Sequence, residues 1–277
     1  STRSEAFLSD SHGRDHVTKS SIAMDKDGHF LGVKVDTVAA VGAYLSQYGI
    51  FIPTLAGAGM HVGVYKIPTL YNKVNVVYTN TVPVDAYRGA GRPEASYVIE
   101  RLVDKAADDL GIDPLELRMK NFVQPDEIGK NEGSILPFDS CDFQKTTEMS
   151  IVNSSYSDFV NRKKSADKSK YLKGIGVSYY VERTQGEGSE NSRVVVSSDG
   201  SVKVYAGTMA TGQGHETAWT QILVEKLGVN PEDVSVHFGD SDDLPGGGGT
   251  GGSKSLYMAA GAINDASEAM LKKGIEI

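Results

Sequence analysis

The sequence predicts an α+β protein built from two mixed sheet-and-helix domains. In the first half, strand patterns precede one long amphipathic helix, and in the second half strands and helices alternate. Between these halves lies a polar stretch, residues 163–170, with the composition of an interdomain linker. A solvated helix end would fit the same stretch. We therefore expect a first domain at residues 1–165 and a second at residues 171–277.

The composition is that of a folded protein that does not bind nucleic acid. The 277 residues are 39% hydrophobic and 23% charged, enough for two cores, and the net charge is −8. The negative charge and the lack of a Lys/Arg run argue against phosphate-backbone binding. Cys141 is the single cysteine, which fits a reducing compartment, and no apolar run reaches the length of a membrane span. We expect a cytoplasmic protein with no membrane partner.

The first domain is expected to open with a hairpin. Residues 20–24 and 30–40 have strand patterns, and Asp25–Gly28 between them is a strong turn sequence. Residues 42–63 are expected to be irregular with short helices, and residues 73–79 to form a strand.

Helix signals follow. Pro93 suits the first helical position, an apolar stripe continues to Leu110, and Gly111 suits the C-terminal cap. Asp113 is the expected N-cap of a short helix that runs to Asn121. Beyond it we expect a surface loop at residues 123–140 and a helix at residues 143–162. In the second domain we expect strands at residues 174–182, 192–197, 202–207 and 234–238, and helices at residues 216–227 and after Ser255.

Two glycine-rich stretches each lead into one of the second domain's helices. They are residues 207–217 and 245–255. Glycine lets a ligand approach the backbone, and a helix N-terminus offers free N–H groups to an anion. The pair predicts one large, phosphate-bearing ligand held from two sides, although two ordinary helix-leading turns would look alike.

A third loop of this kind lies at residues 83–93. Arg88 and Arg92 flank glycines directly before a helix, and guanidinium groups suit phosphate or oxo ligands. The alternative for Arg88 is an ordinary surface charge in a mobile loop.

The sequence approaches three familiar motifs but matches none of them. A P-loop requires glycine before Lys254, where Ser253 stands. The acidic residues Asp240–Asp243 lack the central glycine and distal Glu of a calcium loop. His12 and His16 have zinc-ligand spacing, but Gly13 occupies the position of the required Glu.

Several motifs, in order along the chain, resemble those of the molybdenum-cofactor subunit of the xanthine dehydrogenase, aldehyde oxidase and carbon monoxide dehydrogenase family. The resemblance covers essentially the whole chain. The motifs are residues 12–16, 86–94, 100–104, 111–121, 211–217, 239–242 and 249–255.

This resemblance implies the fold of a molybdenum hydroxylase large subunit and molybdopterin as the cofactor, often as a dinucleotide. No protein side chain ligates the metal in this family, because molybdenum is held through the pterin. The implied reaction is hydroxylation of an aldehyde or heterocycle, with electrons leaving through iron–sulfur and FAD partners. The implied cofactor-binding residues are Ala86, Arg88, Gly89, Gln213, Gly214, Gly251, Gly252, Ser253, Lys254 and Ser255.

Two departures from the family's sequence pattern narrow the range of expected substrates. Carbon monoxide dehydrogenases carry cysteine after the arginine that matches Arg88, where this chain has Gly89, so carbon monoxide is disfavoured. Xanthine dehydrogenases place a bulky aromatic residue where this chain has Ala90 in the implied substrate pocket, so a purine is disfavoured.

The family's general-base Glu matches no residue of this sequence, so we assign no catalytic residue. We expect these residues to form part of a longer large subunit, with little turnover and weak or absent cofactor binding in isolation. A non-catalytic scaffold subunit of the same fold is the alternative, and a nucleotide-binding α/β domain is a weaker one.

Overall fold

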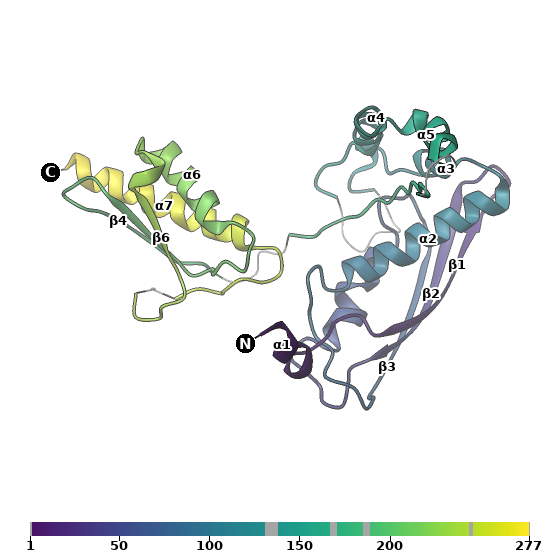
Figure 1. Cartoon of the computed structure of the whole chain (residues 1–277), viewed down its shortest axis with the longest axis horizontal. Helices are drawn as coiled ribbons and strands as arrows, with labels where there is room; N and C mark the ends of the chain where they lie inside the picture. The colour runs from purple at the N-terminus through teal and green to yellow at the C-terminus, as the bar shows by residue number, and fades with distance from the viewer. Residues whose placement is uncertain (1, 131–137, 167–170, 185–188, 244–245, 277) are drawn as a thin grey trace. The chain divides into compact units, whose positions relative to one another are not determined.

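The computed structural model divides into two compact units, residues 1–182 and residues 183–277. Each unit has its own hydrophobic core and is described by itself (Figure 1). The structure describes residues 2–130, 138–166, 171–184, 189–243 and 246–276.

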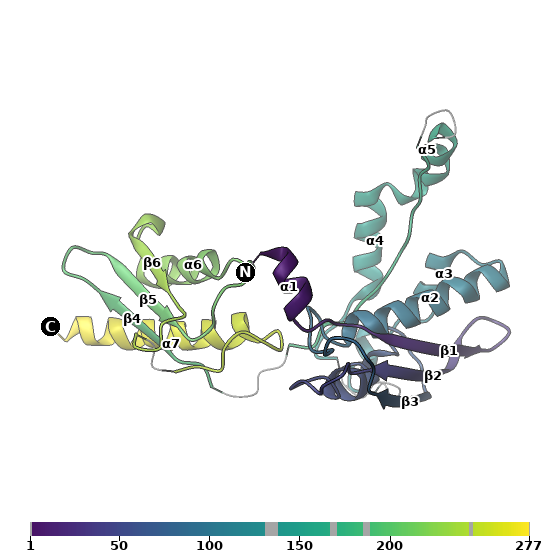
Figure 2. The same ribbon diagram turned by 60° about the horizontal axis from the view of Figure 1, so that its bottom comes forward.

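The first unit is built on a three-stranded sheet in the order β1–β2–β3 (Figure 2). Its strands are β1 (His16–Met24), β2 (Phe30–Ala40) and β3 (Leu70–Val77). β1 and β2 are antiparallel, and β3 is parallel to β2. The predicted hairpin is confirmed. Its turn closes because the Asp25 carboxylate accepts hydrogen bonds from the amides of Asp27 and His29, each at 2.9 Å.

Helices α2 (Arg92–Leu110) and α3 (Pro114–Lys120) begin and end within one residue of the predicted positions. Gly111 closes α2 in the left-handed conformation, and the Asp113 carboxylate accepts from the first amides of α3. α2 packs its apolar stripe against the sheet. The buried cluster comprises Phe30, Val33, Val35, Val62, Val64, Tyr65, Ile67, Ile99, Val103, Ala106, Ala107, Leu117 and Phe122.

A buried charged network joins α2 to α3. Arg118 is fully buried, and its Nε donates to Glu100 Oε2 and its Nη2 to Asp104 Oδ1, each at 2.9 Å. The Tyr65 hydroxyl donates to Glu100 Oε1 at 2.5 Å, and burial, with the nearby carboxylate, raises the pKa of Tyr65. Three of these residues belong to the motifs at 100–104 and 111–121. The contacts show that their role within this unit is structural.

The segment at residues 42–63 is irregular with short helices, as predicted. It contains the π-helix η1 (Ile52–Ala56) and the 3₁₀-helix η2 (Ala58–Met60). Helix α1 (Arg3–Ser9) was not predicted, although Thr2 and Glu5 form a reciprocal capping box at its start.

The helical segment predicted at residues 143–162 is confirmed but interrupted at Ser155. The structure has α4 (Phe143–Ser154), the 3₁₀-helix η4 (Tyr156–Asp158) and α5 (Phe159–Ala166). Ser155 adopts a left-handed conformation with φ of 51° and ends α4. α5 occupies the first part of the predicted linker, as the helix-end alternative requires, and residues 167–170 lie outside the described part of the chain.

The strand predicted at residues 174–182 is wrong. The segment is extended, but no strand of the described chain pairs with it. Tyr179 and Val181 pack against the core of the first unit. Within the predicted loop at 123–140, the described residues contain the 3₁₀-helix η3 (Pro125–Glu127), and residues 131–137 are outside the description.

The second unit is a three-stranded sheet, β4–β5–β6, covered on one face by two adjacent helices (Figure 1). Its elements match the predictions from residue 192 onward. β4 is antiparallel to β5, and β6 is parallel to β5. The elements are β4 (Ser192–Val196), β5 (Val202–Ala206), α6 (His215–Leu227), η5 (Pro231–Asp233), β6 (Val234–His237) and α7 (Ser255–Ile275).

The core of the second unit contains the chain's single tryptophan. Trp219 on α6 and Ile263 on α7 are fully buried against Val204 of β5. None of the described helices combines the length and apolarity that crossing a membrane requires.

Candidate functional site

The first candidate element is the Arg88 loop, residues 86–91, which leads directly into α2. Its backbone has positive φ at four successive residues: 28° at Arg88, 94° at Gly89, 33° at Ala90 and 89° at Gly91. Positive φ is unfavourable for residues other than glycine, so Arg88 and Ala90 hold backbone strain. Ala86 and Arg88 are exposed, and the Arg88 guanidinium contacts no hydrogen-bond or ion-pair partner within the described residues.

Gly91 is required by space as well as by conformation. A Cβ at Gly91 would lie 2.7 Å from Gly57 N and 2.9 Å from Ile52 O. The irregular segment at 42–63 therefore packs against the start of α2. The Glu94 carboxylate accepts from the Gly91 amide at 2.9 Å, which fixes the junction between loop and helix.

Arg14 clamps the Arg88 loop from the other side. Its Nη2 donates to the carbonyl oxygens of Tyr87 at 2.9 Å and of Arg88 at 2.6 Å. Its Nε lies 3.7 Å from Glu94 Oε1. Because these groups come from three places in the loop–helix junction, Arg14 holds the strained backbone in one conformation.

The Arg14 clamp depends on the motif at residues 12–16. The chain at His12 pairs with Val84 as a parallel bridge, and a Cβ on Gly13 would lie 2.9 Å from Tyr87 Cβ. Glycine at 13 therefore lets the two backbones approach closely enough for Arg14 to reach the carbonyls. The positioning role of Arg14 has no local sequence signal, because its contacts lie more than 70 residues away along the chain.

The second candidate element is the first glycine loop, residues 207–214, before α6. Gly214 caps α6 with φ of 79°, and Gly212 has φ of 101°. The Gln213 side chain is exposed, and its Oε1 accepts from the Thr211 amide at 2.6 Å and from Thr211 Oγ1 at 3.1 Å. These bonds occupy the Gln213 Oε1 acceptor and do not use its Nε2 donor.

The third candidate element is the second glycine loop, residues 246–254, before α7. Gly252 and Ser253 have φ of 62° and 57°, and Lys254 is the N-cap of α7. Gly251 and Gly252 are exposed, whereas Ser255 is buried in the first turn of the helix.

The two glycine loops lie side by side in the second unit. A Cβ on Gly207 would lie 2.8 Å from Gly247 Cα, so both glycines are needed for this close approach. Thr250 Oγ1 donates to the Met209 carbonyl oxygen at 2.6 Å. The loops that carry Gln213 and Ser253 are thus brought together, while Ala86, Arg88, Gly89 and Ala90 belong to the first unit.

Glu190 supports the second glycine loop and was not predicted. Its Oε1 accepts from the Gly248 amide at 2.9 Å, and its Oε2 is buried without a partner within the described residues. A Cβ on Gly248 would lie 2.6 Å from Lys254 Nζ and 3.0 Å from Glu190 Oε1. The carboxylate and the ammonium group therefore flank the same glycine.

The glycine loops fit a large ligand with anionic groups. An added Cβ at Gly212, Gly214 or Gly251 would meet no atom within 4 Å, so these backbones face open space. Three buried polar atoms of the same unit have no partner within the described chain: Thr208 Oγ1, His215 Nδ1 and Trp219 Nε1. Open backbone at two helix N-termini suits phosphate and polar ring atoms.

Comparison with known proteins finds two matching domain models. The molybdopterin cofactor-binding domain matches at residues 1–122, and a second molybdopterin cofactor-binding domain matches at residues 151–277. The two matches together include every one of the loops described above.

Curated relatives share about 30% of their residues with this chain. It is 30% identical to the 6-hydroxypseudooxynicotine dehydrogenase complex subunit gamma of Paenarthrobacter nicotinovorans, over 98% of this chain and 35% of that protein. It is 31% identical to the carbon monoxide dehydrogenase large chain of Hydrogenophaga pseudoflava, over 94% of this chain and 34% of that protein. The chain thus spans about a third of the length of these relatives.

Solved structures agree on the fold. Quinoline 2-oxidoreductase from Pseudomonas putida 86 superposes with a TM-score of 0.86 and 29% identity, covering 97% of this chain and 36% of that one. The chain therefore belongs to the molybdopterin cofactor-binding family of molybdenum hydroxylase large subunits.

Proposed function

We propose that this chain forms part of a molybdenum hydroxylase that oxidatively hydroxylates an aldehyde or a heterocycle. The observation that supports this most directly is the pair of adjacent glycine loops with open backbone before α6 and α7. When bound, the molybdenum cofactor would supply the hydroxylation chemistry. Electrons would leave through iron–sulfur and FAD partners. Residues 1–165 and 171–277 would be partial first and second cofactor-binding domains, and the single cysteine favours the cytoplasm as compartment.

The roles proposed for individual residues follow from their positions. Gln213 Nε2 would donate to an oxygen of the molybdenum centre, and Gly214 would offer its amide nearby. Gly251, Gly252, Ser253, Lys254 and Ser255 would hold the pterin and its phosphate through the N-terminus of α7.

The Arg88 loop would line the molybdenum side of the pocket. Arg88 would present its unpaired guanidinium to oxo or phosphate oxygens, with Ala86 and Gly89 shaping the wall. Ala90 would border the substrate. Its small side chain, with Gly89 in place of cysteine, disfavours purines and carbon monoxide. The general base would come from polypeptide outside residues 1–277.

The cofactor site is tested by placing a side chain at Gly251, where the backbone faces open space. Gly251→Val adds a side chain where no atom lies within 4 Å of the Cβ, so the fold should persist. In the complete subunit we expect molybdenum and pterin content per polypeptide to fall at least tenfold, roughly 1.4 kcal/mol or more of binding. Gly261→Val on α7 is the matched control, because its Cβ also meets no atom within 4 Å. Equal molybdenum content in both variants would refute the assignment.

A non-catalytic scaffold subunit is the second candidate, and Gln213 separates the two. Gln213→Ala in the assembled enzyme should lower the hydroxylation rate by roughly tenfold to a hundredfold. Gln221→Ala, an exposed glutamine on α6, should leave it unchanged. An unchanged rate and molybdenum content in Gln213→Ala would favour the scaffold.

A further consequence concerns the chain by itself. Residues 1–277 alone should show little turnover, because the base would be contributed from elsewhere. Hydroxylation of an aldehyde by this purified chain would contradict the proposal.

A further inference from the structure

The segment at residues 175–181 has the character of a strand but no strand partner in the described chain. From residue 176 to residue 181 its side chains alternate between exposed and half-buried, with Val177, Tyr179 and Val181 on the inner side. Such alternation is the pattern of a strand with one face on a core. Tyr179 stacks edge-on against Phe122 with ring centroids 4.9 Å apart, which anchors the inner side.

One edge of this segment lies beside Glu100. Burial raises the pKa of the Glu100 carboxyl, and the nearby Tyr179 amide partly offsets that shift. Because backbone groups alternate between the two edges of a regular extended chain, the amides of Ser178 and Tyr180 would face the other edge. A row of backbone groups that no strand of the described chain satisfies is a template for strand addition.

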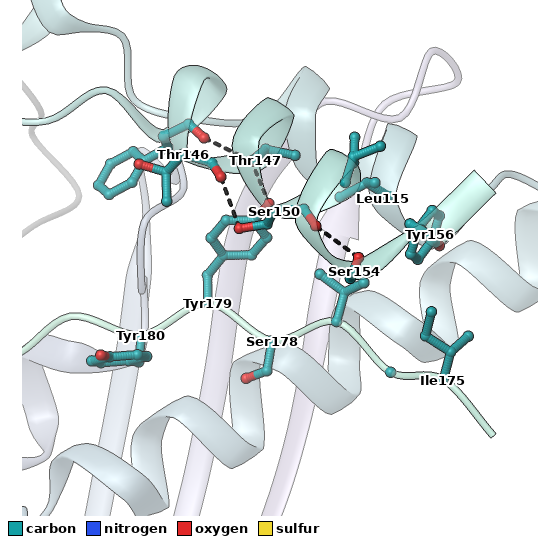
Figure 3. A pocket seen from close by; sticks show the side chains of 14 residues that line it. Leu115, Thr146, Thr147, Ser150, Ser154, Tyr156, Ile175, Ser178, Tyr179 and Tyr180 are labelled. Carbon is teal, nitrogen blue, oxygen red and sulfur yellow. Dashed lines mark hydrogen bonds between the residues drawn. The ribbon is translucent and has the colours of Figure 1, made fainter. Parts of the chain in front are cut away.

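A groove runs between this segment and α4, as Figure 3 shows. Its volume is about 610 Å³, and no charged side chain lines it. One wall is Ile175–Tyr180, and the other is the α4 face that carries Thr146, Ser150 and Ser154. These three small residues are spaced at intervals of four, so they form one shallow stripe that lets a backbone approach closely.

The hydroxyl groups of that stripe are already used. Thr146 Oγ1 donates to the Asp142 carbonyl oxygen, Ser150 Oγ to that of Thr146, and Ser154 Oγ to that of Ser150, at 2.7–3.0 Å. The Thr147 hydroxyl bonds with that of Tyr179 and with the Phe143 carbonyl oxygen. These hydroxyl groups already donate to carbonyl oxygens of their own helix, so they are poorly suited to bind a charged small molecule. A neutral occupant that brings its own backbone donors and acceptors fits better.

We propose that this groove receives an extended segment of the same large subunit, from outside residues 1–277, which pairs with Ile175–Val181 as a β-strand. A partner of about six residues would span the wall, at roughly 3.3 Å per residue. The curated relatives are about three times as long as this chain, so most of such a subunit lies outside these residues. A tethered strand also has a high effective concentration, which a separate protein lacks.

An exposed aromatic side chain in the groove wall agrees with this occupant. Tyr180 lines the groove and is 75% exposed. If a strand paired with this segment, Tyr180 would gain cross-strand neighbours.

Hydrogen exchange tests the pairing directly. Amide exchange is measured by mass spectrometry on residues 1–277 and on the complete large subunit, each free of cofactor. We expect peptides covering residues 175–181 to exchange at least about tenfold more slowly in the complete subunit. β2 (Phe30–Ala40), which is paired in both, should exchange equally. Fast exchange of residues 175–181 in both proteins, or equal protection in both, would overturn the proposal.

A groove-filling variant assigns the effect to this site. Ser150→Trp in the complete subunit should restore fast exchange at residues 175–181, because the indole occupies the groove. Val152→Trp, on the same helix but 76% exposed and outside the groove, should retain the protection. Protection retained in both variants would overturn the site. Protection that arises in residues 1–277 alone as concentration rises would assign the groove to a second copy of the chain, which also overturns the proposal.

This inference depends on the family and not on the cofactor chemistry. The exchange experiment uses cofactor-free protein, so a failure of Gly251→Val to lower molybdenum content would leave its result intact.

Discussion

At the scale of single residues, Arg14 holds the Arg88 loop by donating to two of its carbonyl oxygens. A charged group that donates to two carbonyls contributes roughly 1.5–3 kcal/mol when buried, and its side chain is 29% exposed. We expect Arg14→Ala to lower the free energy of unfolding by about 1–2 kcal/mol and to speed amide exchange at residues 87–91.

Two comparisons make the Arg14 prediction specific. Arg14→Lys should restore only part of the loss, because one ammonium group cannot reproduce the guanidinium fork. Arg101→Ala removes an exposed ion pair and should change stability by at most about 0.5 kcal/mol. Unaltered exchange at residues 87–91 in Arg14→Ala would show that the loop holds its conformation without the clamp.

Two histidines of the first unit predict a pH dependence. Burial lowers the pKa of His16 and of His61, and His16 lowers that of His61 further. The unfolded chain titrates near pH 6.5, so just below that pH it binds more protons than the folded chain. The contribution of these two histidines to the free energy of unfolding is therefore fully present above about pH 6.5 and is lost as the pH falls toward their lower folded-state pKa values. Urea denaturation from pH 7.5 to 5.5 should show this decline, and His61→Gln should reduce its slope. An identical slope in the variant would contradict the assignment.

At the scale of elements, the α2–α3 pair depends on Arg118. Arg118→Met leaves the Glu100 carboxylate buried without its cation, which costs about 3–5 kcal/mol. The double variant Arg118→Met with Glu100→Gln removes the uncompensated charge and should recover part of that loss. Thermal or chemical denaturation of the two proteins measures this. A double variant no more stable than the single one would show that packing, not charge, is what Arg118 provides.

The elements predicted from the sequence are those with local signals. The Asp25–Gly28 turn, the Gly111 cap and the Asp113 cap each act within a few residues, so their helices and strands were correctly located. Ser155 was missed because its left-handed conformation breaks α4 without a glycine. The strand predicted at residues 174–182 is absent from the described sheets, because alternation indicates a strand but does not supply a neighbour for it to pair with.

For the candidate site, as for the fold, the features with a local sequence signal were predicted and the long-range contacts were not. The glycine loops were found from composition, and the structure brings the two of the second unit together. Arg14, Glu190 and Thr250 were missed as supports, because each acts on a loop at least 40 residues away. The ligand-binding roles of Arg88, Gln213 and Ser253 stay predictions.

At the scale of the whole molecule, the buried apolar side chains form two separate clusters, one in each unit. Trp219, the single tryptophan, is fully buried in the second, so tryptophan fluorescence reports that unit alone. Leu223→Ala should destabilise it by about 2–5 kcal/mol and shift the fluorescence transition, while exchange in β2 stays the same.

The reciprocal variant completes this prediction. Ile99→Ala removes a fully buried side chain of the first cluster and should accelerate exchange in β2 without moving the fluorescence midpoint. If either variant shifted both signals equally, the two units would unfold as one cooperative body.

Because Arg88 and Ala90 have positive φ angles, a substitution that raises the stability of this loop could also weaken cofactor binding. Glycine adopts that geometry freely, whereas a left-handed side-chain residue loses roughly 1–2 kcal/mol. A library screened only for heat resistance should accumulate Arg88→Gly, and one screened for molybdenum uptake should reject it. That outcome would mean that the Arg88 loop is less stable than the same loop with glycine at position 88.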